Sequence, residues 1–367
     1  MQKKIQAAVA ILLCAVLAVI PLSGVKDSFS VQNVEKSAMV KSIGFDEGEN
    51  SATISYVTGV IADNSASHAQ ALISAPGGSF AEAEKKAQIL ADKYLTFSYA
   101  KHFVIGMDTA KNSTERLLDF LLASPVLQLS SYIYLCEDSA RELLREVSKD
   151  DISTNEVLTN LNLAGKEEGY YAPVTVLSLA KAAAEHTSIA IPIIGKQEQG
   201  ENSAKKTVLV FKGYGVLQDG SLRTILNPAR ARAYNILMNQ VERTVAECDK
   251  SDILLKKMRC TKRLEMEGEQ VKAVHYHIKA TAEFASFSGE SLEDESFVSA
   301  QTEQEKKLLL SEICDLLDFL REKHLDALHL MQEADILSGG KAAPEAPEQA
   351  AYTVEISQHL EKAYNLK

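Results

Sequence analysis

Tryptophan is absent from the 367-residue chain, cysteine occurs five times, and no basic stretch interleaved with aromatic residues is found. The 39 Lys and Arg residues are outnumbered by 50 Asp and Glu residues, so the net charge is −11. An acidic surface repels phosphate backbones, and we therefore expect no nucleic-acid partner. The cysteines show no CxxC or Cys/His spacing that would indicate a zinc site. Hydrophobic residues make up 46% of the chain, as in ordinary folded proteins.

Charged residues are missing altogether from Ile5 to Val25, directly after Lys3 and Lys4. A stretch of this length suffices to cross the hydrocarbon core of a bilayer. Its position at the N-terminus and its flanking lysines favour a membrane segment over a buried core helix. Because the positive flank stays in the cytoplasm, the body of the chain is predicted to lie outside. We expect residues 1–25 to be a signal sequence or membrane anchor.

The end of this stretch bears on how it is processed. Residues 22–24, Leu-Ser-Gly, match the lead-in to a lipidated bacterial cysteine, yet Val25 stands where that cysteine is required. Cys14 follows Leu13, where a small residue is needed instead. We therefore expect a retained helix rather than a lipid anchor, with cleavage near Gly24 as the alternative.

The four remaining cysteines are Cys136, Cys248, Cys260 and Cys314. Outside the cytoplasm a disulfide can form, and Cys248 with Cys260 is the pair nearest in sequence. Reduced or buried cysteines are the equal alternative, and the sequence leaves the choice open.

Two β-type runs open the folded part of the chain. Ala38–Asp46 and Thr53–Ile61 flank a polar turn and predict a hairpin, followed by a loop over Asp63–Gly78. Ser79 and Glu82 form a capping box for a predicted helix. The elements expected after the loop are a helix Phe80–Leu95 with Phe80, Ala83, Ala87, Leu90 and Tyr94 on one face, a strand His102–Met107, a helix Thr114–Ala123 capped by Asn112 or Ser113, a strand Ser130–Cys136, a helix Ser139–Val147 capped by Asp138, a helix from a capping box at Ser153 and Glu156 to about Glu168, and a helix from Thr175 through His186.

The segment Lys196–Lys206 is nearly free of large apolar residues and is our predicted domain boundary. It divides a domain over 26–198 from a domain over 206–367. The elements expected in the second part are a hairpin of Thr207–Leu217 and Leu222–Leu226 around Asp219-Gly220, a helix from Asn227-Pro228 to about Thr244, strands Ile253–Met266 and Gln270–Phe284, a helix of roughly Glu303–Gln332, a loop Gly339–Gln349 and a strand Tyr352–Ser357.

Alternating strands and helices with antiparallel hairpins place the chain in the α+β class. We expect mixed or antiparallel sheets with packed helices, in two or three subdomains, after an N-terminal hydrophobic segment.

No residue pattern indicates catalysis. His275 and His277 share one face of a predicted strand, but no third ligand for a metal lies nearby. Residues 213–215, Gly-Tyr-Gly, lack the third glycine of a dinucleotide fingerprint, and residues 287–289, Phe-Ser-Gly, lack the first glycine of a nucleophile elbow. Residues 76–78, Pro-Gly-Gly, precede a helix N-terminus where an anion could bind, although a surface loop explains them as well. We expect no catalytic, cofactor-binding or metal site.

Five segments in a fixed order together resemble one protein family. The chain is similar there to the Ger(x)C proteins, the third or C subunits of the nutrient germinant receptors of spore-forming bacteria. Each segment matches a strand or helix motif of that family. The segments are Val40–Asp46 (VKSIGFD), Tyr99–Met107 (YAKHFVIGM), Leu117–Pro125 (LLDFLLASP), Gly169–Leu179 (GYYAPVTVLSL) and Thr207–Asp219, which ends in KGYGVLQD.

The resemblance implies an α+β ectodomain on the outer surface of the spore inner membrane. It also implies assembly with two membrane-embedded partners, the receptor A and B subunits, and no catalysis. Members of the family usually carry a lipidated cysteine followed by Trp-Asp, whereas residues 25–27 here are Val-Lys-Asp. The alternative function is that of an extracytoplasmic solute-binding module of an importer, which would place a cleft between two α/β lobes.

Overall fold

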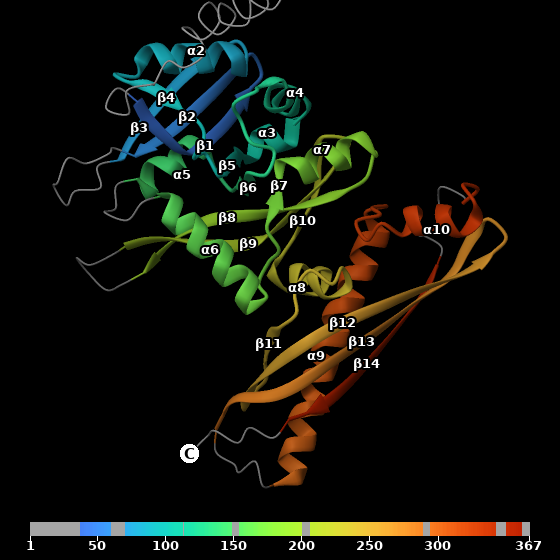
Figure 1. Ribbon diagram of the computed structural model, residues 1–367. Helices are drawn as coiled ribbons and strands as arrows, with labels where there is room; N and C mark the ends of the chain where they lie inside the picture. The colour runs from blue at the N-terminus through green and yellow to red at the C-terminus, as the bar shows by residue number, and fades with distance from the viewer. Residues whose placement is uncertain are drawn as a thin grey trace, which may run out of the picture.

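The computed structural model describes residues 37–59, 70–112, 114–148, 154–199, 206–288, 294–342 and 350–361. These residues form an elongated α+β molecule with two β-sheets, one toward each end (Figure 1). The class predicted from the sequence is confirmed. In the described part of the chain no helix is both long and apolar enough to cross a membrane. The predicted anchor, residues 1–25, lies outside it.

The larger sheet has ten strands and occupies the N-terminal half. Its order is β10-β9-β8-β6-β5-β1-β2-β3, with β4 paired to β1 and β7 paired to β6. Pairing is parallel from β1 through β5 and β6 to β8, and antiparallel toward both edges. The strands are β1 (Ser37–Gly48), β2 (Ser51–Gly59), β3 (Gln70–Gly77), β4 (Tyr94–Thr96), β5 (His102–Gly106), β6 (Tyr132–Cys136), β7 (Val174–Thr175), β8 (Ile189–Gln199), β9 (Lys206–Gln218) and β10 (Ser221–Leu226).

Helices cover both faces of this sheet. Four of them share one hydrophobic core with Phe45, Phe103 and Ile133. The opposite face carries a second core, built by α5 and α6 on Val104, Tyr134 and neighbouring side chains. In Figure 1, α2 and α5 accordingly lie on opposite sides of the N-terminal strands. The helices are α2 (Phe80–Leu90), α3 (Met107–Asn112), α4 (Glu115–Ala123) and α7 (Val176–Ala184) on the first face, and α5 (Ala140–Val147) and α6 (Thr154–Glu168) on the second.

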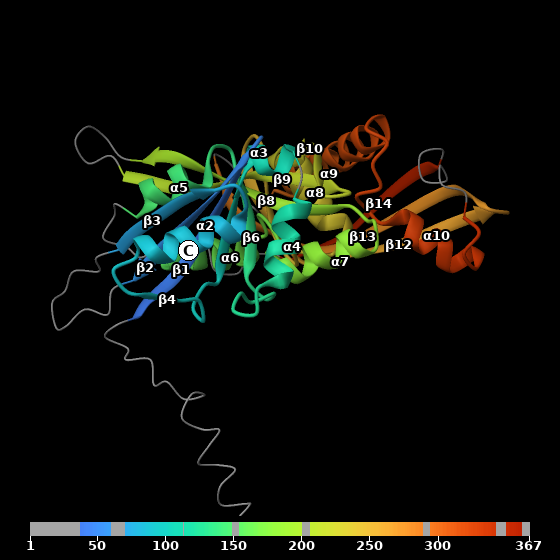
Figure 2. The same ribbon diagram turned by 90° about the horizontal axis from the view of Figure 1, so that it is seen from above.

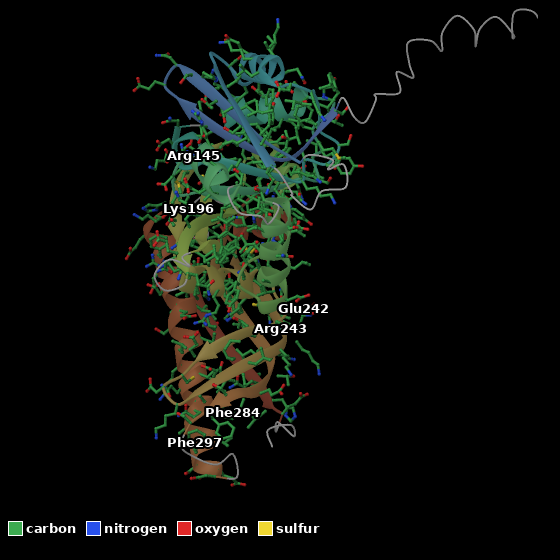
Figure 3. All side chains as sticks on the ribbon, turned by 90° about the vertical axis from the view of Figure 1, so that its left-hand side faces the viewer. Arg145, Lys196, Glu242, Arg243, Phe284 and Phe297 are labelled. Atoms are coloured by element: carbon green, nitrogen blue, oxygen red, sulfur yellow. The ribbon has the colours of Figure 1, made fainter. Side chains whose placement is uncertain are left out.

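The smaller sheet has four strands in the order β11-β12-β13-β14. Its strands are β11 (Thr244–Glu247), β12 (Ser251–Glu267), β13 (Gln270–Phe287) and β14 (Ala351–Leu360), and β14 runs parallel to β13. One face packs on the long helix α9 (Glu295–Glu322), whose Leu309, Ile313 and Leu316 are fully buried. Phe284 of β13 and Phe297 of α9 stack with ring centroids 6.3 Å apart near the far end (Figure 3).

Two shorter helices complete the C-terminal half. In α8 (Pro228–Leu237), Asn227 accepts a hydrogen bond from Arg230 N at 2.9 Å, which confirms the predicted cap. Arg230 pairs with Asp315 of α9 at 2.7 Å, so α8 is fastened to the long helix. After α9, the chain turns into α10 (Leu330–Ser338).

Several predicted boundaries were wrong. The helix predicted from Asn227 to Thr244 ends at Leu237, and Thr244 begins β11. The single helix predicted over Glu303–Gln332 is two helices, since His324 and His329 adopt left-handed conformations between α9 and α10. The predicted loop Asp63–Gly78 contains β3, and β4 and β8 were not predicted.

One predicted cap was also wrong. Asp138 was expected to cap the helix that begins near Ser139, but the carboxylate at that helix N-terminus belongs to Asp46 of β1. The caps at Ser79 and Thr175 are confirmed, with oxygen–nitrogen distances of 3.2 and 3.3 Å. The capping box proposed at Ser153 lies outside the described residues.

The predicted domain boundary at 196–206 overlaps the end of β8 and the first residue of β9, and Gln199 pairs with Lys206. The two strands are antiparallel neighbours in the larger sheet, which continues through them to β10. The predicted turn at Asp219-Gly220 joins β9 to β10, and both turn residues have positive φ, as the primed hairpin turns require. The division of the chain into domains at 198 and 206 stays a prediction.

Candidate docking surface

Asp46, at the end of one resemblance segment, closes a helix terminus. Its carboxylate accepts hydrogen bonds from Ala140 N at 2.7 Å, Arg141 N at 2.9 Å and Ser139 Oγ at 3.0 Å. Such a carboxylate satisfies the free amides of α5 and opposes the helix dipole. A Cβ at Gly106 would lie 2.3 Å from Asp46 Oδ1, so glycine is needed beside it. Asp46 and Gly106, which belong to two different resemblance segments, therefore both serve the fold.

His102, in a second resemblance segment, is 1% exposed. Its Nδ1 lies 3.0 Å from the Tyr134 hydroxyl and its Nε2 lies 3.1 Å from Thr159 Oγ1 of α6. Burial, helped by the charge of Lys101, lowers the pKa of this imidazole to about 4. A neutral ring offers one donor and one acceptor, and both are used here. The histidine thus links α6 to the sheet and leaves no nitrogen for catalysis.

Tyr214, the centre of the Gly-Tyr-Gly segment, joins the two halves of the molecule. Its hydroxyl donates to Asn235 Oδ1 at 2.8 Å and accepts from Ala172 N at 2.7 Å. Gly213 has φ +127°, and a Cβ there would lie 2.0 Å from Leu226 O. The segment lies inside strand β9, as the sequence predicted, whereas a dinucleotide fingerprint lies at a strand-to-helix turn.

The two histidines considered for a metal are held by the neighbouring strand. His275 Nδ1 lies 2.6 Å from Thr353 Oγ1, and His277 Nε2 lies 2.9 Å from Ser357 Oγ. Glu265 approaches His275 at 3.5 Å. Among the described residues, no group of three or more His, Cys, Asp or Glu side chains could hold a metal ion. The described cysteines, Cys248 and Cys260 included, are all free.

The possible anion site after Pro76 is occupied by the chain itself. Gly78 N donates to the carboxylate of Glu82 at 2.8 Å, and Gly78 O accepts from Arg116 at 3.1 Å. The amide that would face an anion already has an intramolecular carboxylate partner. The segment 287–289 extends beyond the described residues at Gly289.

A cavity of about 370 Å³ lies between α7 and the C-terminal half. Its position between the two halves is where a solute-binding module would need a cleft. Its Glu185 is paired with Lys181 at 3.8 Å and with Gln332 at 3.2 Å, and burial lowers the pKa of the neighbouring His329. The charges at this cavity are therefore already matched within the chain.

An open groove of about 760 Å³ lies near one end of the molecule. We call it the apolar groove and define it by its walls: α2 from Ala81 to Ile89, β4 with residues 97–98, and residues 125–128. Large apolar side chains on these walls face water, with Ile89 72%, Tyr94 55% and Val126 50% exposed. Contiguous exposed apolar surface of this kind marks an interaction site.

Sequence reasoning missed this surface. Leu90 and Tyr94 were predicted to face the core with Ala87, but α2 ends at Leu90, which is 63% exposed, and Tyr94 lies in β4. The adjacent pair Ile89-Leu90 gave no signal of exposure, because adjacent apolar residues such as Leu316 and Leu317 of α9 are buried together in one core.

The apolar groove adjoins the point where the chain enters the described structure. Ser37, the first residue of β1, pairs with Tyr94, and Ala38 pairs with Leu95. Seen from above in Figure 2, β1 and β4 lie side by side at one margin of the N-terminal half. The groove is therefore close in space to Ser37, where the described structure begins.

Comparison with known proteins gives one family and one fold. Residues 30–196 match the family described as the spore germination protein N-terminal domain. The fold is similar to that of the crystal structure of the GerBC protein, with a TM-score of 0.55 and 13% identity. The alignment covers 87% of this chain and 96% of GerBC. No curated protein sequence matches the chain.

Proposed function

Through its N-terminal domain the chain belongs to the spore germination proteins of the Ger(x)C family, and from this premise we propose that it is the C subunit of a nutrient germinant receptor. In this proposal residues 1–25 hold it at the outer face of a membrane. It works by docking to two membrane-embedded subunits, A and B, and catalyses no reaction. The match of the germination domain over residues 30–196 carries the proposal.

Two features of the described residues support docking over chemistry. The polar groups that resemble catalytic or metal-binding residues, His102 and the pair His275 and His277, are engaged in hydrogen bonds within the chain. The apolar groove presents apolar side chains to water, with Ile89 and Val126 exposed. Exposed apolar area without reactive groups suits a binding role.

Germination of spores that lack the gene tests the receptor role. The deletion should abolish or strongly slow germination with at least one nutrient, and the full-length gene should restore it. The tagged full chain should also co-purify from spore membranes with two proteins that cross the membrane several times. Unchanged germination with every nutrient tested would contradict the proposal.

The same strain tests the absence of chemistry in the receptor. A double substitution of His275→Gln and His277→Gln removes the pair that most resembles a metal site. Germination should remain at the wild-type level, because these rings contact only β14 and Glu265. Loss of germination with the protein still folded and abundant would favour a metal-dependent role.

The alternative, a solute-binding module, is favoured only by the cavity of about 370 Å³ between the two halves. A ligand that binds only the folded state stabilises it by RT ln(1 + L/Kd), where L is the free ligand concentration, and so raises the melting temperature. A panel of amino acids, sugars and nucleosides should give no shift if the chain is a docking subunit. A saturable shift, abolished by Lys181→Ala, would favour the alternative.

A further inference from the structure

We propose that the apolar groove seats on the lipid surface of the membrane that holds the N-terminus. The inference rests on the proposed membrane attachment and goes beyond it by naming the face of the ectodomain that meets the bilayer. The occupant is the lipid headgroup and upper acyl region, rather than a second protein.

The first support is the composition of the groove walls. Ile89 of α2 lines the groove and is 72% exposed, Leu90 beside it in the chain is 63% exposed, and Val126 on another wall is 50% exposed. None of these side chains contributes to a described hydrophobic core. Apolar side chains that flank an open groove gain by leaving water, and lipid is the apolar phase nearest to the anchor.

The second support is the position of the groove on the chain. If residues 5–25 lie in the bilayer, only residues 26–36 separate them from Ser37, which pairs with groove residue Tyr94. Eleven residues reach at most about 40 Å when fully extended. A short tether therefore keeps this groove at a high local concentration near the membrane surface.

The third support is the chemistry of the rim. Tyr94 lines the groove and is 55% exposed. Tyr99 directly follows the lining segment in the chain and is 52% exposed, and the ammonium of Lys41 lies 5.7 Å from its ring centroid. Lys85 lines the groove itself, next to the carboxyl group of Glu84. Tyrosine places an apolar ring beside a polar hydroxyl, and lysine extends an aliphatic stem toward a charged head, so both suit the headgroup layer. Anionic headgroups complement the lysines although the whole chain is acidic.

Seating at this groove would fix the orientation of the molecule. The groove belongs to the end that carries α2 and β4, whereas the four-stranded sheet lies at the opposite end (Figure 1). The open face of that sheet would then project away from the lipid and stay free.

The absence of tryptophan allows a direct test, because a single introduced Trp is the only strong indole signal. Ile89→Trp places the reporter in the groove, and Val126→Trp places a second one on its other wall. Ile336→Trp is the matched control, since Ile336 also lies near the end of a short helix, α10, and is 79% exposed. Each full-length variant is reconstituted into phosphatidylcholine–phosphatidylglycerol vesicles, and folding is checked by circular dichroism.

We expect the emission of the two groove variants to shift to the blue and to be quenched several-fold more by nitroxide-labelled lipid than that of the control. Vesicle flotation separates the possible failures. A chain that floats with vesicles but shows no lipid quenching at either groove position overturns this inference and leaves the proposed attachment intact. A chain that does not float overturns both.

Two other occupants give different patterns. Protection of the groove reporters from aqueous iodide without lipid quenching would mean that residues 5–25 fill the groove, and would overturn the inference. A blue shift that needs co-reconstituted multi-span subunits, again without lipid quenching, would overturn it in favour of a protein partner.

Discussion

The two sheets of the molecule differ in how many of their faces are covered. Helices pack on both faces of the ten-stranded sheet, and its central strand β5 is buried at every residue from His102 to Gly106. The four-stranded sheet shares a single core with α8, α9 and α10, and β12 alternates between buried residues such as Cys260 and exposed ones such as Thr261. Coverage of one face or two decides how a polar side chain can be tolerated within a strand.

Histidines illustrate the difference. His102 in the covered sheet needs two precise partners, Tyr134 and Thr159, because no water reaches it. His275 in the open sheet is partly exposed and makes its bonds to Thr353 and Glu265 where water could replace either. One residue type therefore has a structural role in one sheet and little energetic weight in the other.

The largest effect is expected from removing a ring at the centre of the covered sheet. Phe103 is fully buried and meets Phe45 edge-to-face with centroids 5.7 Å apart. Phe103→Ala should lower the free energy of unfolding by about 3–5 kcal/mol, since the ring leaves a cavity that neighbours cannot fill. Urea denaturation followed by circular dichroism measures this. A loss below about 1 kcal/mol would mean that the covered core is loosely packed.

The next largest effect is expected from lowering the pH, which should destabilise the covered sheet through His102. The pKa of His102 is about 4 in the fold against about 6.5 when unfolded, so below pH 6.5 the unfolded chain takes up a proton that the folded chain does not. The stability contributed by the neutral ring is present above pH 6.5 and is lost as the pH falls toward 4. Between pH 7.5 and 5, the wild type should lose about 2 kcal/mol more than His102→Gln.

The control for that experiment is His359→Gln, which replaces an exposed histidine of β14. Its stability should follow the wild-type pH profile. If His102→Gln also followed that profile, the buried imidazole would have to be protonated or hydrated in the fold.

A smaller effect is expected at the terminus of α5. Asp46→Ala removes three hydrogen bonds and should lower the free energy of unfolding by about 1–2 kcal/mol. Asp138→Ala is the matched control, because that side chain is 60% exposed and faces Lys196 at 3.7 Å. It should change stability by less than about 0.5 kcal/mol. If Asp138→Ala lowered the free energy of unfolding more than Asp46→Ala, Asp138 would be the cap of α5, as the sequence predicted.

The smallest effect is expected on the open face of the second sheet. Thr261 is exposed on β12, opposite His277 of β13. Thr261→Val should change the free energy of unfolding by less than about 0.5 kcal/mol, because the His277 carbonyl, which accepts from the Thr261 hydroxyl at 3.3 Å, can bond to water instead. A loss above about 1 kcal/mol, measured by the same denaturation, would mean that this face is covered in solution.

The sequence predicted short-range features well. The hairpins around residues 47–50, Asp219-Gly220 and 267–269 were confirmed, since each turn sits between alternating runs that flank it directly. The caps at Ser79, Thr175 and Asn227 were confirmed for the same reason. The α+β class was confirmed as well, and the match of residues 30–196 to the spore germination protein N-terminal domain agrees with the Ger(x)C resemblance.

Long-range features were missed. The cap of α5 comes from Asp46, which lies 94 residues before Ala140, and no local pattern indicates such a partner. β8 escaped because its apolar run from Ile189 to Ile194 shows no alternation, as expected for a strand buried on both faces. The apolar groove was missed because it is assembled from three separated segments.

The pairing of β8 with β9 separates two ways of counting domains. The match to the spore germination protein N-terminal domain ends at residue 196, inside β8, whereas the hydrogen-bonded sheet ends two strands later at Leu226. The matched segment is therefore completed by two strands that lie after its end, β9 and β10. If the chain ended at residue 196, β8 would be an unpaired edge strand of the sheet. Such edges pair with strands of other molecules.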